Sequence, residues 1–111
     1  MKNPLGDKQR LLHILESIKN IFSFTKKIDE KEFLSNLLIQ SAVERQLEII
    51  GEATASVSDS LKEKHQEIEW NKIKAFRNII AHEYFGVSKK QVWNVVVNEL
   101  PVLQKAIKKI K

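Results

Sequence analysis

The sequence predicts an all-α fold, namely a four-helix up-and-down bundle with one short accessory helix. Only three glycines and two prolines occur among the 111 residues, so few positions interrupt regular structure. Apolar residues recur at intervals of three and four, which is the period of an amphipathic helix, and they do not alternate as in a strand. A chain of this length can fold around one core, so we expect a single domain over residues 1–111.

The first two long helices each have a start signal. Asp7 is a capping residue ahead of an apolar stripe that runs to about Ile28, and it predicts the first helix. Asp29 and Glu32 form a capping-box pattern with Asp in the Ser/Thr place. This pattern predicts a long second helix that ends near Ser56.

The second half of the chain contains a short helix and two long ones. Residues 56–60 are typical of a turn, and residues 61–65 are expected to form the accessory helix. A third long helix is expected over residues 70–86, because its last residue is a glycine, which favours the conformation just after a helix end. Residues 88–91 form another capping box, which opens the last helix, and Pro101 is expected to kink or restart it.

Composition excludes several kinds of chemistry. The chain has no cysteine, so disulfides, thiolate metal sites and a cysteine nucleophile are excluded, and a reducing cytoplasm is the expected location. It shows no signal-peptide pattern and no run of about 18 apolar residues, so we expect a soluble protein without membrane contact. Much of the net charge of +5 comes from lysines near the C-terminal end, which either contact an RNA backbone or stabilise a helix end.

Arg77 clearly breaks the helical pattern of the third helix. At about 100° per residue, it falls within the apolar arc of that helix, so its guanidinium would face the core or an interface. A charge in such a place is costly unless it is paired and hydrogen-bonded. The sequence therefore predicts a partner group close to Arg77.

The second helix supplies candidate partners, because three carboxylates stand one turn apart along it: Glu44, Glu48 and Glu52. One of these carboxylates would hold Arg77 or orient His82. The alternative is an exposed strip in which Arg45 pairs with a glutamate three or seven positions later.

Arg77, Asn78 and His82 permit cleavage of a phosphodiester without a metal ion. Histidine moves a proton near neutral pH, and arginine binds phosphate bidentately and stabilises the charge of the transition state. Asn78 would orient the phosphate or fix the tautomer of the imidazole. RNA supplies its own nucleophile, the 2′-hydroxyl. We expect no metal site, since no HExxH motif, histidine pair or aspartate-rich cluster occurs. The alternative is a structural salt bridge beside a histidine that is satisfied within the fold.

At these positions the sequence resembles the HepT-like family of HEPN-domain proteins. Arg77, His82 and Tyr84 match the R-x4-H-x-Y motif of that family, and Asn78 matches the polar residue that typically follows the Arg. The similarity extends to the other helices and covers nearly the whole chain.

The resemblance implies a homodimer in which two motif helices face each other across a cleft for an RNA substrate. It implies a ribonuclease toxin of a type VII toxin–antitoxin system, encoded beside an MntA-like nucleotidyltransferase antitoxin. That antitoxin would use ATP as AMP donor to adenylylate Tyr84, while the toxin itself would need no cofactor. Two alternatives stay open: a non-catalytic subunit that holds nucleotide or substrate for the nucleotidyltransferase, and a Tyr84 that only packs.

The spacing of Arg77 and His82 raises a geometric question. Five residues apart, their side chains point about 140° away from each other on a straight helix. Either the last turn before Gly86 unwinds, or the Arg of one subunit acts with the His of the other across a two-fold axis. We expect the second arrangement.

Overall fold

The computed structural model describes residues 4–77 and 89–110 of the chain, and within these ranges every regular element is helical. The predicted all-α class is confirmed. The elements follow one another as α1 Pro4–Thr25, α2 Glu30–Leu34, α3 Leu37–Ser56, α4 Asp59–Lys64, α5 Trp70–Lys74, α7 Lys89–Asn94, the π-helix η2 Val95–Glu99 and α8 Leu100–Lys108.

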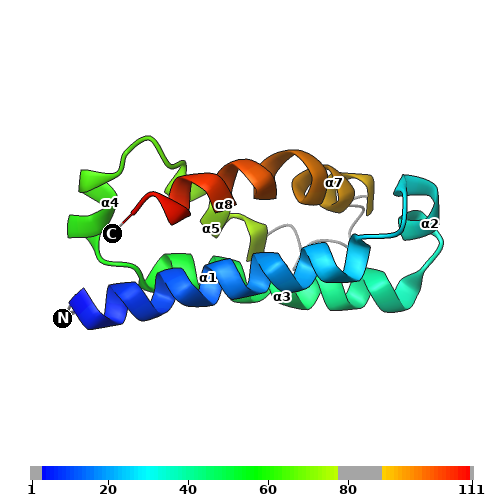
Figure 1. Cartoon of the computed structure of the whole chain (residues 1–111), viewed down its shortest axis with the longest axis horizontal. Coiled ribbons are helices and arrows are strands. Elements are labelled where there is room, and N and C mark those ends of the chain that lie inside the picture. Colours follow the sequence, from blue (N-terminus) through cyan, green and yellow to red (C-terminus); the bar gives the residue numbers. More distant parts are fainter. Residues whose placement is uncertain (1–3, 78–88, 111) are drawn as a thin grey trace.

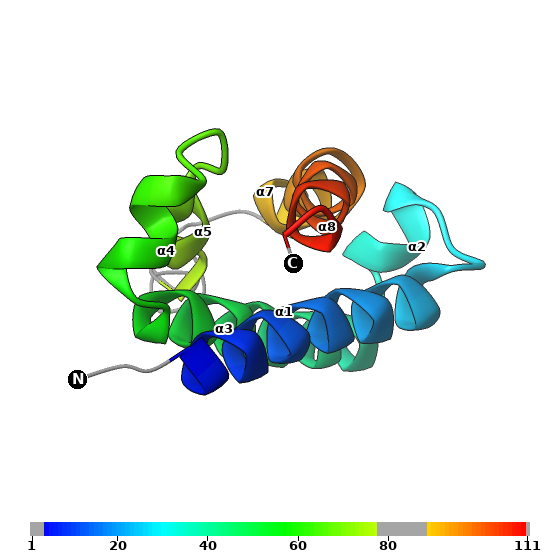
Figure 2. The same cartoon turned by 60° about the vertical axis from the view of Figure 1, so that its left-hand side comes forward.

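The helices form two layers. α1 and α3 run antiparallel along one side of the molecule, and α7, η2 and α8 lie over them as one continuous rod (Figure 1). In a turned view, α4 and α5 lie on one side of this rod and α2 on the other (Figure 2). The core is built from apolar side chains that include these fully buried ones: Ile14, Ile18, Ile21, Phe33, Val43, Leu47, Ile50, Val92 and Leu100.

Several predicted helix ends are confirmed. Asp29 and Glu32 form the predicted capping box: the Glu32 N–H donates to Asp29 Oδ1 at 2.9 Å, and the Asp29 N–H donates to Glu32 Oε1 at 3.3 Å. α3 ends at Ser56, α4 overlaps the expected short helix at residues 61–65, and α5 begins at Trp70.

Asp7 does not cap α1, contrary to the prediction. α1 begins at Pro4, where the fixed φ of proline suits the first helical turn, and it ends at Thr25 rather than near Ile28. Asp7 is instead buried and accepts two hydrogen bonds from Ser58, from the backbone N–H at 2.8 Å and from the hydroxyl at 2.6 Å. Since Ser58 also caps α4, Asp7 joins the start of α1 to the start of α4.

The predicted second helix is in fact two helices. α2 ends at Leu34, and α3 begins after Asn36, whose side chain accepts a hydrogen bond from the Ile39 N–H at 3.0 Å. The Ser35 hydroxyl donates to a backbone carbonyl of α2 at 3.2 Å. Serine and asparagine side chains compete with the helical backbone for hydrogen bonds, which accounts for a break at these two positions.

The predicted third helix is interrupted at Ala75. α5 ends at Lys74, and helical backbone resumes at Phe76. At Ala75 ψ is −10°, whereas a regular α-helix has a ψ of about −42°. Ile73 and Phe76 are both buried on either side of this turn, so their packing takes precedence over a continuous helix. The predicted end at Gly86 lies outside the described residues.

Pro101 has the predicted local effect on the last helix. Five residues of π-helix precede α8, and Pro101 lies in the first turn of α8. Proline has no N–H, and its ring crowds the carbonyl four residues earlier, so a wider turn at that place relieves the clash. The helix begins at Lys89, while Ser88 of the predicted capping box lies outside the described residues.

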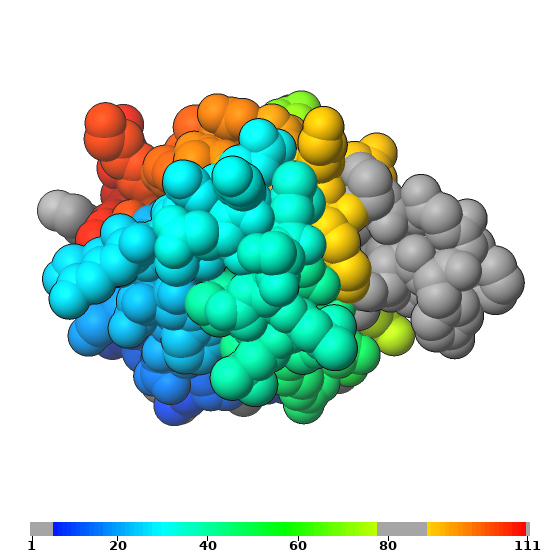
Figure 3. All heavy atoms as spheres, turned by 90° about the vertical axis from the view of Figure 1, so that its right-hand side faces the viewer, coloured from blue at the N-terminus to red at the C-terminus, as the bar shows by residue number. Residues whose placement is uncertain are grey.

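Large apolar side chains are exposed at the end of the bundle that α2 and the first turn of α3 form. Leu37 and Leu38 are 73% and 79% exposed. Figure 3 faces this end and shows the atoms of α2 and early α3, in cyan and teal, beside the start of α7 in amber. Among the described residues, no helix is both long and apolar enough to cross a bilayer.

Candidate functional site

The predicted motif falls only partly within the described structure. Arg77 is the last described residue before residues 78–88. Asn78, His82 and Tyr84 lie outside the described residues, so the roles predicted for them stay predictions. The structure does place Arg77, the part of α3 that lies near it, and the start of α7.

Arg77 is exposed in the single chain, so of the two predicted places, the core and an interface, it does not occupy the core. A place at an interface stays a prediction. The arc assumes a straight helix, and the turn at Ala75 removes that condition. Phe76 takes the buried position and is 3% exposed. Arg77 is exposed, and no hydrogen bond or ion pair joins its guanidinium to another described residue. A guanidinium carries five N–H donors, which suit an anionic ligand.

Gly51 of α3 allows Arg77 to approach this helix closely. A Cβ atom on Gly51 would lie 2.7 Å from Arg77 Cγ and 3.3 Å from the Arg77 backbone nitrogen. Since real Cβ atoms essentially never come so close to another atom, a larger residue would push Arg77 away.

Gly51 was not among the predicted site residues, although a glycine inside a predicted helix is unusual. A glycine inside a helix costs about 1 kcal/mol relative to alanine, so its presence there calls for a packing or functional reason. The close contact with Arg77 supplies that reason.

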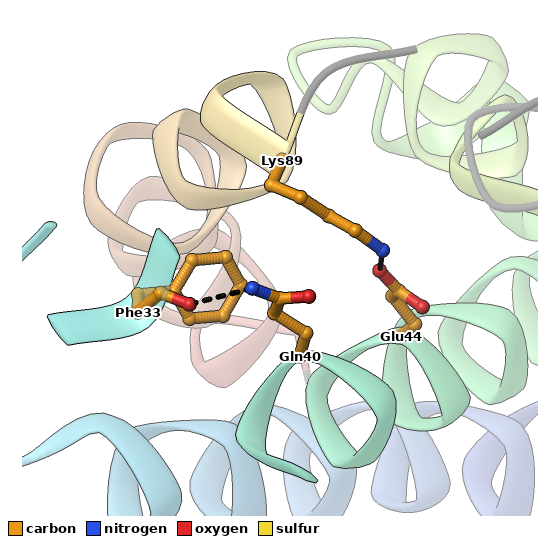
Figure 4. Close-up of polar contacts among 4 residues, drawn as sticks. All are labelled: Phe33, Gln40, Glu44 and Lys89. Carbon is orange, nitrogen blue, oxygen red and sulfur yellow. Dashed lines mark hydrogen bonds and ion pairs between the residues drawn. The ribbon is translucent and has the colours of Figure 1, made fainter. Parts of the chain in front are cut away.

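Glu44, the first candidate carboxylate, binds Lys89 rather than Arg77 (Figure 4). Lys89 Nζ lies 2.6 Å from Glu44 Oε2, and the side chains are 29% and 12% exposed, respectively. Lys89 is the first residue of α7 and the first described residue after residues 78–88. The sequence gives no local signal for this pair, because its members lie far apart in the chain and on different helices.

Neither Glu48 nor Glu52 forms a hydrogen bond or ion pair with Arg77. Glu48 Oε1 binds Arg45 Nη1 at 2.8 Å in an exposed pair, which is the alternative stated from the sequence. Glu52 is exposed. A role for any of the three carboxylates in orienting His82 stays a prediction.

A polar and aromatic contact holds α2 and α7 against the start of α3. Gln40 Nε2 donates to the Phe33 carbonyl at 2.8 Å, one turn before Glu44 on the same helix (Figure 4). The ring of Phe33 lies 5.1 Å from the ring of Trp93, centroid to centroid. Trp93 is therefore a packing residue, and it lies one turn after Lys89.

The described residues contain no cluster of potential metal ligands. No three side chains of His, Cys, Asp or Glu lie close enough there to hold a metal ion. His82 and Glu83 are not among the residues that this statement covers.

Known proteins similar to this chain are ribonucleases by name. The family model described as "Ribonuclease HepT-like" matches residues 14–110. The chain is 39% identical over 100 residues to a protein of Methanocaldococcus jannaschii named as a "Putative RNase", covering 90% of this chain and 92% of that protein. It is 36% identical to the "Probable ribonuclease HepT" of Thermococcus cleftensis, with 94% of each chain covered. No solved structure gives a significant match.

Proposed function

Because this chain belongs to the HepT-like ribonuclease family, we propose that it is an RNA endonuclease that works without a metal ion. The observation that carries the proposal is the family match over residues 14–110. The exposed Arg77, whose guanidinium forms no hydrogen bond or ion pair with another described residue, supports it. We also propose that the protein is the toxin of a type VII toxin–antitoxin system.

Arg77 is the proposed phosphate-binding residue. Its planar guanidinium can donate two parallel hydrogen bonds to the oxygens of one phosphate. As the nucleophile adds to phosphorus, negative charge grows on those oxygens, and a donor already held in place stabilises that charge. The absence of a side chain at Gly51 lets the stem of Arg77 lie close to α3, below the exposed guanidinium.

His82 is the proposed proton-transfer residue, and Asn78 assists by binding phosphate or the imidazole. The 2′-hydroxyl of RNA loses its proton to a base and forms a bond to the adjacent phosphorus, while the bond from phosphorus to the 5′-oxygen breaks. The leaving 5′-oxygen takes up a proton. Cleavage of this kind leaves a 2′,3′-cyclic phosphate and a 5′-hydroxyl, so no protein nucleophile is required.

Tyr84 is the proposed control point. An MntA-like nucleotidyltransferase would join the phenol oxygen of Tyr84 to the α-phosphorus of ATP, releasing pyrophosphate. The attached AMP places bulk and negative charge seven residues from Arg77, where it competes with RNA phosphate by occupancy and by repulsion.

The proposed activity is tested with total RNA and the purified protein. We expect cleavage that continues in the presence of a chelator and products that end in a cyclic phosphate. His82→Ala should lose this activity, whereas His13→Ala, which removes an exposed histidine on α1, should keep it. RNA that is bound but uncut would instead favour the non-catalytic subunit, and cleavage that stops with chelator would contradict the metal-free mechanism.

The proposed control by Tyr84 is tested by mass. Co-expression with a neighbouring nucleotidyltransferase should add the mass of AMP to the protein, and Tyr84→Phe should prevent the gain. A gain that persists in Tyr84→Phe would place the modification elsewhere and would contradict the assignment.

A further inference from the structure

We propose that Glu44 is a positioning residue for the reaction at Arg77, acting through its ion pair with Lys89. The pair fixes the position of Lys89, at which the chain enters α7 after residues 78–88. It thereby sets the distance that this stretch spans. This inference rests on the ribonuclease function proposed above.

α3 holds both ends of the stretch that contains His82. Arg77, just before it, lies against Gly51, and Lys89, just after it, binds Glu44. Residues 44 and 51 are seven positions apart on one unbroken helix, so they share a face and lie about 10 Å apart along the axis. One continuous helix therefore sets the distance between the two ends.

The contact between Glu44 and Lys89 is well suited to hold a fixed distance. At 2.6 Å it is a short, charge-assisted hydrogen bond. The Glu44 side chain is 12% exposed, whereas the partners of the Arg45–Glu48 pair on the same helix are 62% and 41% exposed. Water and salt therefore weaken the Glu44 pair less than the exposed one.

The packing of α7 has other sources of stability. Val92, one turn after Lys89, is fully buried, and Val95 and Val96 are buried beyond it. The Trp93 ring packs on Phe33 at 5.1 Å. These contacts hold the body of α7, while Lys89 lies at its first residue. Loss of the ion pair should therefore displace the entry to α7 and leave the rest of the bundle in place.

Glu44→Gln and Lys89→Met test the proposal through steady-state cleavage of a defined RNA. Glu44→Gln keeps the shape of the side chain and removes its charge. We expect kcat to fall by about 10- to 100-fold in both variants, because small displacements of reacting groups have effects of that size, with KM nearly unchanged. Lys89→Arg keeps the charge and should retain most of the activity.

Two variants serve as matched controls. Lys72→Met breaks the ion pair of Lys72 with Glu99, a 3.0 Å contact between two helical elements, and Arg45→Met breaks the exposed pair of Arg45 with Glu48 on α3. Both should leave kcat unchanged. A rise in KM for Lys89→Met with kcat intact would show that Lys89 binds RNA itself, and it would overturn the positioning role.

Amide hydrogen exchange tests the anchoring without any RNA. In Glu44→Gln, amides of residues 78–88 should exchange faster than in the parent, while those of α1 and α3 stay the same. Unchanged exchange at residues 78–88 would overturn the proposal even if the protein is a ribonuclease. Faster exchange in a protein that cuts no RNA would support the anchoring and would refute the ribonuclease function alone.

Discussion

Two buried threonines of this bundle differ in whether their hydroxyl groups have a hydrogen-bond partner. Thr25 Oγ1 donates to the Ile21 carbonyl at 2.9 Å, which is the usual way in which a helix satisfies a buried hydroxyl. Thr54 on α3 is fully buried, yet its Oγ1 has no partner among the described residues. A buried hydroxyl without a partner costs stability, because it has lost its hydrogen bond to water.

Thr54→Val should leave the free energy of unfolding unchanged or raise it by about 1 kcal/mol, since the swap removes the unsatisfied hydroxyl and keeps the shape. Thr25→Val is the matched control and should lower stability by a similar amount, because it removes a hydroxyl that is bonded. Urea unfolding of both variants measures the difference. A Thr54→Val protein less stable than the Thr25→Val protein would contradict this account.

Helix starts were more predictable than helix lengths. The capping box at Asp29 and Glu32 is local, so its pattern could be read directly from neighbouring residues. The interruption at Ala75 could not be read, since neither glycine nor proline marks it and it depends on how Ile73 and Phe76 pack in the core. Asp7 was assigned to the wrong helix start because its actual partner, Ser58, is 51 positions away in sequence.

Gly51→Ala should reduce cleavage by 10-fold or more with little change in stability. The added methyl would meet Arg77 Cγ at 2.7 Å and displace it. A helix gains about 1 kcal/mol from the same change, which offsets part of the cost of crowding. Ser41→Ala on the exposed side of α3 is the control. Full activity in Gly51→Ala, measured beside its unfolding free energy, would show that the position of Arg77 on α3 does not matter.

At the scale of the whole molecule, the fold class could be predicted from the sequence, but the contacts around Arg77 could not. Amphipathic spacing was sufficient for the all-α class and for most helix positions, because a periodic apolar stripe has few ways to be buried. The surroundings of Arg77 depend on contacts between helices. The close approach of Gly51 to Arg77 and the Glu44–Lys89 ion pair were seen only in the structure. No glutamate pairs with Arg77 among the described residues.

A catalytic site shared between two subunits can be recognised because mixing two inactive variants restores activity. Arg77→Ala and His82→Ala should each be inactive alone. If Arg77 of one subunit acts with His82 of the other, subunit exchange between the two variants should restore about a quarter of the parent activity, because half of the dimers are mixed and each has one intact site. No recovery, in a mixture shown by native mass to contain mixed dimers, would place both residues in one subunit.

The role of Arg77 in cleavage is tested by the single-turnover rate of RNA cleavage by Arg77→Ala beside Arg45→Ala. Both changes remove one exposed arginine, but Arg45 is paired with Glu48, while the Arg77 guanidinium forms no hydrogen bond or ion pair with another described residue. We predict a loss of about 100-fold or more for Arg77→Ala and a rate near that of the parent for Arg45→Ala. Equal rates for the two variants would contradict a role for Arg77 in cleavage.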